Sequence, residues 1–244
     1  MGVRALAAQG LRLVFPPQCI VCGARVESEF ALCGPCWRET RFIPGLVCDG
    51  CGMPLPGVDD GAPALCDDCL VIARPWARGR AVFLYEGTGR SLVLALKHGD
   101  RLDLARPLGA WMARAAAPII APGMIVAPVP LSRWRLWRRR HNQAADLARG
   151  LAAAAALTLV PDLLIRIRRT PTQEGRGREA RFANLEGAIA AAPSHVPALA
   201  GRHVLLVDDV MTSGATLAAA AEACLGAGAA AVSVVVLARV AAPG

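Results

Sequence analysis

Two adjacent carboxylates, Asp208 and Asp209, precede a short loop of small and hydroxyl-bearing residues, and this run carries the clearest chemistry in the sequence. Four apolar residues at 204–207 predict a buried parallel strand before them, and the apolar run from 217 predicts a helix after the loop. A helix N-terminus offers unpaired N–H groups and a positive dipole end, so it binds phosphate. The paired carboxylates suit two ribose hydroxyls, bound directly or through magnesium. The run therefore predicts a site for a phosphorylated sugar.

The loop supplies the expected phosphate cradle, because small residues let backbone amides curl around an anion. In open α/β sheets, ligands bind at the carboxyl ends of strands, where this loop is expected. The run VLLVDDVMTSGATL resembles the signature of type I phosphoribosyltransferases, which use 5-phosphoribosyl-1-pyrophosphate (PRPP). The resemblance implies that PRPP and Mg²⁺ bind here, with both aspartates as catalytic candidates. The residues assigned to PRPP in this run are Asp208, Asp209, Thr212, Ser213, Gly214, Ala215 and Thr216.

Other phosphate-handling sites fit this run less well. A Walker A loop is excluded because no Gly-Lys-Ser/Thr sequence is present. A receiver-type phosphoacceptor site needs a lysine at the end of a late strand, and the only lysine is Lys97. The remaining alternative is an acidic turn between a core strand and a surface helix.

Four C-x-x-C pairs lie within the first 70 residues, at a spacing that places two thiolates on one tight turn. Tetrahedral Zn²⁺ with four thiolates fits best, so two structural zinc sites are expected. Disulfides and iron–sulfur ligation are the alternatives, and interleaved pairing of the turns also stays open. The module would bind nucleic acid or protein, or only cap its neighbour. In sequence order the ligand sets are Cys19, Cys22, Cys33 and Cys36, then Cys48, Cys51, Cys66 and Cys69.

The remaining chain alternates strand and helix patterns, which is typical of a parallel sheet. The sequence thus predicts an α/β protein: a central, mainly parallel sheet flanked by helices, with a small N-terminal zinc-ribbon module. The predicted division is 1–74 for the module and 75–244 for the larger domain. Cys224 is expected in the core. Strands are expected at 81–85, 124–129, 162–166, 203–207 and 231–238, and helices at 89–98, 103–117, 142–157 and 215–227.

Two arginine-rich loops are further candidates. Arg133 follows the strand end near residue 129, and its guanidinium suits a pyrophosphate. Trp134 and Trp137 beside it either stack on a base or pack inward from a solvated basic face. The second loop, at 168–181, is expected to close over PRPP and exclude water, with an ordinary linker as the alternative. The polar candidates in the stretch 168–188 are Thr170, Gln173, Arg181 and Asn184.

Composition bounds the partners and the compartment. A net charge of +8 over 244 residues favours anionic partners, phosphates or nucleic acid. No apolar run reaches the length of a membrane span. Arg12 interrupts the apolar start, which argues against a signal peptide and for a cytoplasmic protein.

Several motifs together resemble the ComF family (ComFC and GntX-like proteins). They are FPPQCIVCG, ALKHGD, VPLSRWR with RRHNQA, TPTQ with RFAN, and the VDDVMTSGAT loop. The resemblance implies a double zinc ribbon joined to a type I phosphoribosyltransferase domain. It also implies a PRPP-binding protein of DNA uptake, natural competence or use of imported single-stranded DNA, with single-stranded DNA and other competence proteins as partners. The alternatives are an active phosphoribosyltransferase of nucleotide salvage and a non-catalytic nucleic-acid-binding protein regulated by PRPP.

Overall fold

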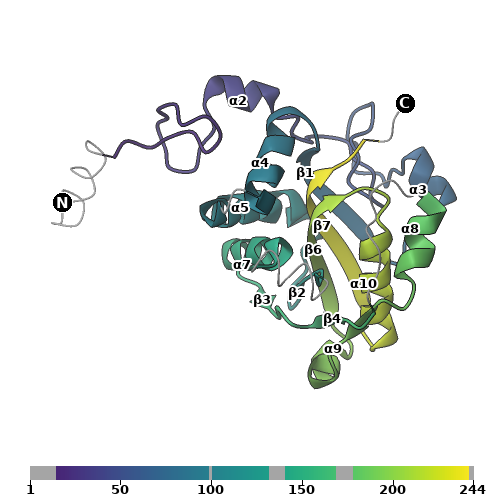
Figure 1. Ribbon diagram of the computed structural model, residues 1–244. Coiled ribbons are helices and arrows are strands. Elements are labelled where there is room, and N and C mark those ends of the chain that lie inside the picture. Colours follow the sequence, from purple (N-terminus) through teal and green to yellow (C-terminus); the bar gives the residue numbers. More distant parts are fainter. Residues whose placement is uncertain (1–14, 99–100, 132–140, 169–177, 242–244) are drawn as a thin grey trace.

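A parallel sheet forms the centre of the computed structural model, which describes residues 15–98, 101–131, 141–168 and 178–241 (Figure 1). It has five strands in the order β1-β7-β6-β2-β3, and every neighbouring pair is parallel. The α/β class predicted from the sequence is confirmed. The strands are β1 (Arg78–Leu84), β2 (Ile125–Pro128), β3 (Thr158–Leu159), β6 (His203–Met211) and β7 (Ala231–Arg239).

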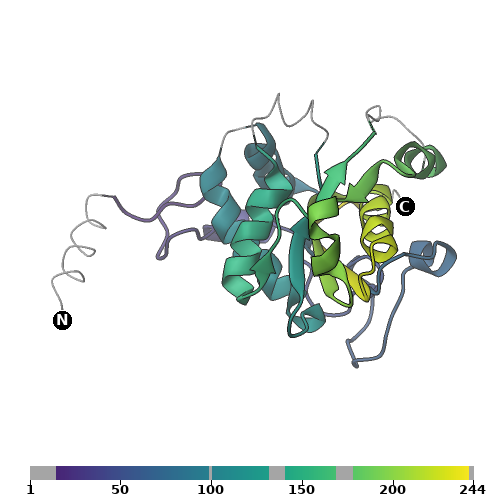
Figure 2. The ribbon, with the colours of Figure 1, turned by 90° about the horizontal axis from the view of Figure 1, so that it is seen from below.

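Helices cover both faces of the sheet (Figures 1 and 2). On one face lie α4 (Gly87–His98), α5 (Ala105–Ala116) and α7 (Gln143–Ala155), and on the other lie α8 (Arg178–Leu185) and α10 (Ala215–Gly226). Val204 and Leu206 pack toward the α10 side, whereas Leu205 and Val207 pack toward the α5 and α7 side. A strand buried on both faces must be apolar throughout, which explains the unbroken run. Cys224 is fully buried in α10, as predicted.

The long alanine-rich helix α7 begins one residue after the start expected at 142. The Asn142 side chain accepts a hydrogen bond from the Ala144 amide at 3.1 Å, which satisfies one of the unpaired N–H groups of the first turn. The helix ends at Ala156, which adopts a left-handed conformation with φ of 53°.

The strand expected at 162–166 does not join the central sheet. It forms β4 (Leu164–Arg166), which pairs antiparallel with β5 (Ile189–Ala191) in a separate sheet of two strands. A strand of three residues is too short to give a periodic signal, so β5 was not predicted. Four short helices complete the fold: η1 (Leu102–Leu104), η2 (Ala117–Ile119), η3 (Pro193–His195) and α9 (Val196–Leu199). No helix among the described residues is long and apolar enough to cross a membrane.

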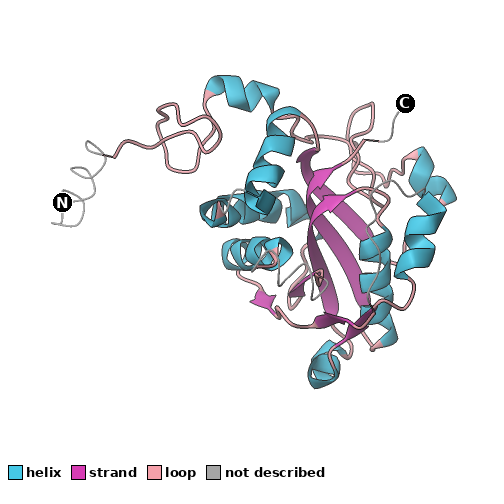
Figure 3. Cartoon of the chain, viewed as in Figure 1, coloured by secondary structure: helices cyan, strands magenta, loops and turns pink. Residues whose placement is uncertain are grey.

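Residues 15–77 are mostly loop, with two short helices, α2 (Gly34–Glu39) and α3 (Asp67–Val71) (Figure 3). The first part of this segment extends away from the sheet, whereas residues 41–43 run along the edge of β1. There the Leu84 amide donates to the Arg41 carbonyl at 2.8 Å, and the Ile43 amide donates to the Val82 carbonyl at 3.0 Å. These bonds cover an edge strand that would otherwise expose unpaired backbone groups.

Candidate functional site

The two aspartates lie within β6, which continues four residues beyond the predicted end at Val207. Successive side chains of a strand point to opposite faces, so Asp208 and Asp209 diverge. Asp208 lines a hollow together with the loop at 212–216. Asp209 instead forms an ion pair with Lys97 of α4 at 2.9 Å, on the other face of the sheet. The structure thus places the two carboxylates in different surroundings.

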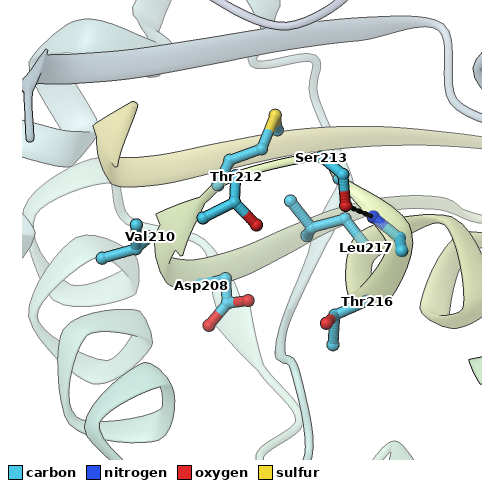
Figure 4. Close-up of a pocket in the computed structure, with 9 residues that line it drawn as sticks. Asp208, Val210, Thr212, Ser213, Thr216 and Leu217 are labelled. Carbon is cyan, nitrogen blue, oxygen red and sulfur yellow. Dashed lines mark hydrogen bonds between the residues drawn. The ribbon is translucent and has the colours of Figure 1, made fainter. Parts of the chain in front are cut away.

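The hollow lies at the carboxyl end of β6, against the start of α10 (Figure 4). Thr212, Ser213 and Thr216 line it, and in Figure 4 Thr216 on the first turn of α10 lies opposite Asp208. The hollow is small, with a volume of about 30 Å³, and it is open to solvent. Hydroxyls, small residues and a helix N-terminus here provide the donors of an anion site.

Gly214 makes the turn from the loop into α10. Its φ of +85° is left-handed, a conformation that glycine adopts without strain. The next amide, that of Ala215, donates to the Ser213 hydroxyl at 3.4 Å. The start of α10 is therefore formed by the residues that the sequence assigned to phosphate.

Asp208 is electrostatically unusual. Burial and the neighbouring Asp209 charge raise its pKa to about 8, and the Asp209 amide, Lys97 and Arg166 only partly oppose this. The Asp208 Oδ1 accepts a hydrogen bond from the Asp209 amide at 2.8 Å. A carboxylate held near a second one is stabilised by a cation, so Asp208 suits a ligand that brings positive charge or hydrogen-bond donors.

Three basic residues contact this region that sequence reasoning did not assign to it. Lys97 pairs with Asp209, Arg74 donates to the Ser213 carbonyl at 2.7 Å, and Arg239 donates to the Thr212 carbonyl at 2.7 Å. Each of these residues is more than 25 positions from its partner in the sequence, so no local spacing pattern could have identified it. The motif ALKHGD did contain Lys97.

Several predicted residues stand apart from this geometry. Arg133, Thr170 and Gln173 lie outside the described residues, as do Trp134 and Trp137. Arg181 falls within α8, and its side chain is not described. The predicted pyrophosphate and closing-loop contacts therefore remain predictions.

Eight cysteines form two groups, in sequence order rather than interleaved. Within each group all Sγ atoms lie within 4.8 Å of one another, and the Cys22–Cys33 and Cys51–Cys66 sulfurs are 3.5 and 3.6 Å apart. Zinc–sulfur bonds of about 2.3 Å in a tetrahedron place the sulfurs roughly 3.8 Å apart, so both groups fit Zn²⁺. The first group is Cys19, Cys22, Cys33 and Cys36, and the second is Cys48, Cys51, Cys66 and Cys69.

The thiols within each group differ in how readily they ionise. A hydrogen bond with Cys51 lowers the pKa of Cys48, and although burial opposes ionisation of Cys19, backbone hydrogen bonds lower its pKa to about 6. A hydrogen bond with Cys48 and burial raise the pKa of Cys51 to about 12. Burial also raises the pKa of Cys36 and of Cys69. Four thiolates at this density require a cation, which a divalent metal supplies.

Comparison with known proteins agrees with this arrangement. A model of the double zinc ribbon domain matches residues 10–70, and a model of the phosphoribosyl transferase domain matches residues 142–243. A protein of Salmonella typhi named DNA utilization protein YhgH is 34% identical over 93% of this chain and 99% of its own length. Competence protein F of Haemophilus influenzae is 28% identical over 82% of this chain and 87% of its own. The chain belongs to the ComF family.

Another ComF-family relative, DNA utilization protein YhgH of Escherichia coli K12, is 33% identical over 93% of this chain. The solved structure of Bacillus subtilis glutamine PRPP amidotransferase aligns with 59% of this chain and 30% of its own, at 20% identity and a TM-score of 0.40. In this ComF protein the double zinc ribbon contains both four-cysteine zinc-binding sites, and the phosphoribosyl transferase domain contains the hollow beside Asp208.

Proposed function

We propose that this protein binds PRPP in the hollow at the end of β6, as a phosphoribosyltransferase-like protein of DNA utilization. The supporting observation is the juxtaposition of the 212–216 loop, the N-terminus of α10 and the partly buried carboxylate of Asp208. The loop amides and hydroxyls bind the 5′-phosphate, and Asp208 binds the ribose hydroxyls. The relatives named for DNA utilization and competence supply the biological setting.

Magnesium fits this donor set, because a partly buried carboxylate beside a second one is stabilised by a divalent cation. Asp208 would hold it, and the ion would supply charge neutralisation for the pyrophosphate. Asp209 contributes to the site indirectly. Its ion pair with Lys97 fixes the end of β6 and leaves the Asp208 side of the strand free for ligand. Transfer to an acceptor nitrogen would break the C1–O bond to pyrophosphate, with charge stabilisation by these groups.

Calorimetry of PRPP binding with and without Mg²⁺ tests this site. The Asp208→Asn and Thr216→Val variants should each lose at least tenfold in affinity, because each removes a group that faces the hollow. Asp103→Asn is the matched control, since Asp103 forms an exposed pair with Arg101. Equal affinity of wild type and Asp208→Asn would contradict the assignment. Pyrophosphate release with candidate acceptors then decides whether the bound PRPP is a substrate.

A second function, binding of single-stranded nucleic acid, is favoured by a groove between the first zinc-ribbon turn and α5. Trp37 and Phe30 are 57% and 40% exposed there, and Arg106 and Arg114 line the same groove. Phe42 connects the aromatic groups, with ring centroids 4.5 Å from Trp37 and 5.5 Å from Trp111. Aromatic faces beside arginines are typical of sites that stack bases and follow a phosphate backbone.

Binding of a fluorescent oligothymidylate at several salt concentrations tests this second function. Trp37→Ala with Arg106→Ala should weaken binding and flatten its salt dependence. Arg149→Ala is the control, because this exposed arginine pairs with Asp146 away from the groove. Unaltered binding by the double variant would exclude the groove as the nucleic-acid site.

A further inference from the structure

The second four-cysteine group packs directly against the central sheet. It consists of Cys48, Cys51, Cys66 and Cys69. The Gly79 amide of β1 donates to the Asp49 carbonyl at 2.6 Å, and Asp49 also accepts from Arg80 at 2.8 Å. Gly52, with φ of +70°, approaches so closely that a Cβ there would lie 2.6 Å from the Ala81 amide nitrogen. The metal turn therefore has a fixed position relative to β1.

Arg74 links this metal group to the phosphate loop. Its guanidinium lies 5.5 Å from the centroid of the Trp76 ring, and the Trp76 indole donates to the Gly50 carbonyl at 2.6 Å. Its Nη1 donates to the Ser213 carbonyl at 2.7 Å. A Cβ on Gly214 would lie 2.9 Å from the same Nη1, so the guanidinium packs directly against the loop.

Arg239 contacts the same loop from the end of β7. Its side chain is buried, with 3% of the residue exposed. Its Nη1 donates to the carbonyls of Met211 at 3.1 Å and Thr212 at 2.7 Å. Together with Arg74, it binds the carbonyls of three consecutive residues, the last of β6 and the first two of the loop.

Binding the carbonyls sets the direction of the amides. A trans peptide unit is planar, and its C=O and N–H point in opposite directions. The carbonyls of residues 211, 212 and 213 belong to the same peptide units as the amides of Thr212, Ser213 and Gly214. Both arginines therefore fix the orientation of the N–H groups that the proposed function assigns to phosphate.

Charge connects Arg74 to the metal group. Four thiolates carry four negative charges and Zn²⁺ two positive ones, which leaves two in excess on the loaded site. Arg74 reaches this charge through Trp76, whose indole is bonded to the Gly50 carbonyl between Cys48 and Cys51. The Arg74 guanidinium thus lies next to a site whose charge and geometry depend on bound zinc.

We propose that the second four-cysteine site positions the phosphate loop through Arg74, so that zinc at this site sets the affinity of the loop for phosphate. This rests on the proposed function of the loop. The first four-cysteine group lies beside α4 and α5, and it provides the internal comparison.

Hydrogen exchange of the zinc-loaded full chain tests the arginine link. Arg74→Ala should speed exchange of the 208–217 segment several-fold and weaken binding of PRPP or inorganic phosphate roughly tenfold. Arg41→Ala is the matched control, because Arg41 forms an exposed pair with Glu86. Unchanged loop exchange in Arg74→Ala would overturn the proposal.

Two half-buried cysteines, one from each group, allow a matched test of the zinc link. Cys66→Ser removes one ligand from the second group and Cys33→Ser one from the first, and metal analysis should find one zinc lost in each. Only Cys66→Ser should speed loop exchange and weaken phosphate binding. Equal effects of both variants, or none, would overturn the proposal.

Exchange in β2 and α7, on the other side of the molecule, shows whether a variant has simply unfolded. If Cys66→Ser speeds exchange there too, the result from Arg74→Ala decides the proposal alone. If the wild type binds neither PRPP nor phosphate, the proposed function fails, while loop exchange still decides whether the metal site orders the loop.

Discussion

The titration of Asp208 gives a sharp test of the site. Its pKa is raised to about 8 by burial and by Asp209, whereas the carboxyl of an unfolded chain titrates near 3.8. Between these values the folded protein keeps a proton that the unfolded chain has released. The stabilisation that this bound proton contributes is therefore complete below pH 4 and is lost as the pH rises through about 8. We expect the ligand-free protein to become less stable from pH 6 to pH 8.

The size of this effect follows from linkage. For a folded pKa of about 8, the free energy of unfolding falls by about 2 kcal/mol between pH 6 and pH 8. In a chain of this length that corresponds to a fall in Tm of about 4–8 °C. Asparagine does not titrate, so the fall in Tm between pH 6 and pH 8 should disappear in Asp208→Asn. At pH 8 this variant should be more stable than the wild type.

Scanning fluorimetry at half-unit pH steps measures the slope in zinc-loaded protein. Asp103→Asn is the control, because its pair with Arg101 lowers the pKa of Asp103 and leaves it ionised throughout this range. A wild type with constant Tm, or an Asp208→Asn variant with the wild-type slope, would refute the reasoning. PRPP with Mg²⁺ should bind more tightly at pH 8 than at pH 6, because the carboxylate must be ionised to take part.

Three other predictions follow from single contacts. Gly214→Ala should lower the Tm by several degrees and weaken phosphate binding, since φ is +85° and the Cβ would meet Arg74; Gly226→Ala, with open space around its Cβ, should not. Lys97→Met should lower the free energy of unfolding in urea by about 1–3 kcal/mol, because the Asp209 carboxylate, 14% exposed, loses its cation; no loss would show that the pair does not form. Purified protein should contain about two zinc ions per chain and lose thermal stability on chelation; thiols found paired as disulfides, without metal, would contradict this.

Local patterns in the sequence were enough for the parallel sheet and for the metal turns. The apolar run at 204–207 and the spacing of the cysteine pairs each reflect short-range geometry, and both appear in the structure as expected. The strand end was wrong by four residues, because two aspartates read as a turn while β7 pairs with β6 as far as Met211. Tertiary pairing there overrides the low strand propensity of aspartate.

The long-range contacts that position the site could not be predicted from the sequence. Arg74 and Ser213 are separated by 139 positions, so the tertiary fold rather than local sequence brings them together. Lys97 was identified as the single lysine of the sequence, but no neighbouring residue indicated that Asp209 would be its partner. If the predicted strand had included both aspartates, the alternation of side chains along a strand would have placed them on opposite faces of the sheet.

The strand order also has a consequence for how the protein is made. β7 follows the other four strands of this sheet in the sequence, yet it lies between β1 and β6 rather than at an edge. The second metal group is complete once Cys69 has been synthesised, long before β1 gains its neighbour in the sheet. Zinc loading can therefore precede closure of the sheet, and the nascent β1 must wait exposed while about 150 further residues are translated. A ribosome that stalls before residue 231 would leave a gap in the middle of the sheet, where such a chain is most prone to aggregate.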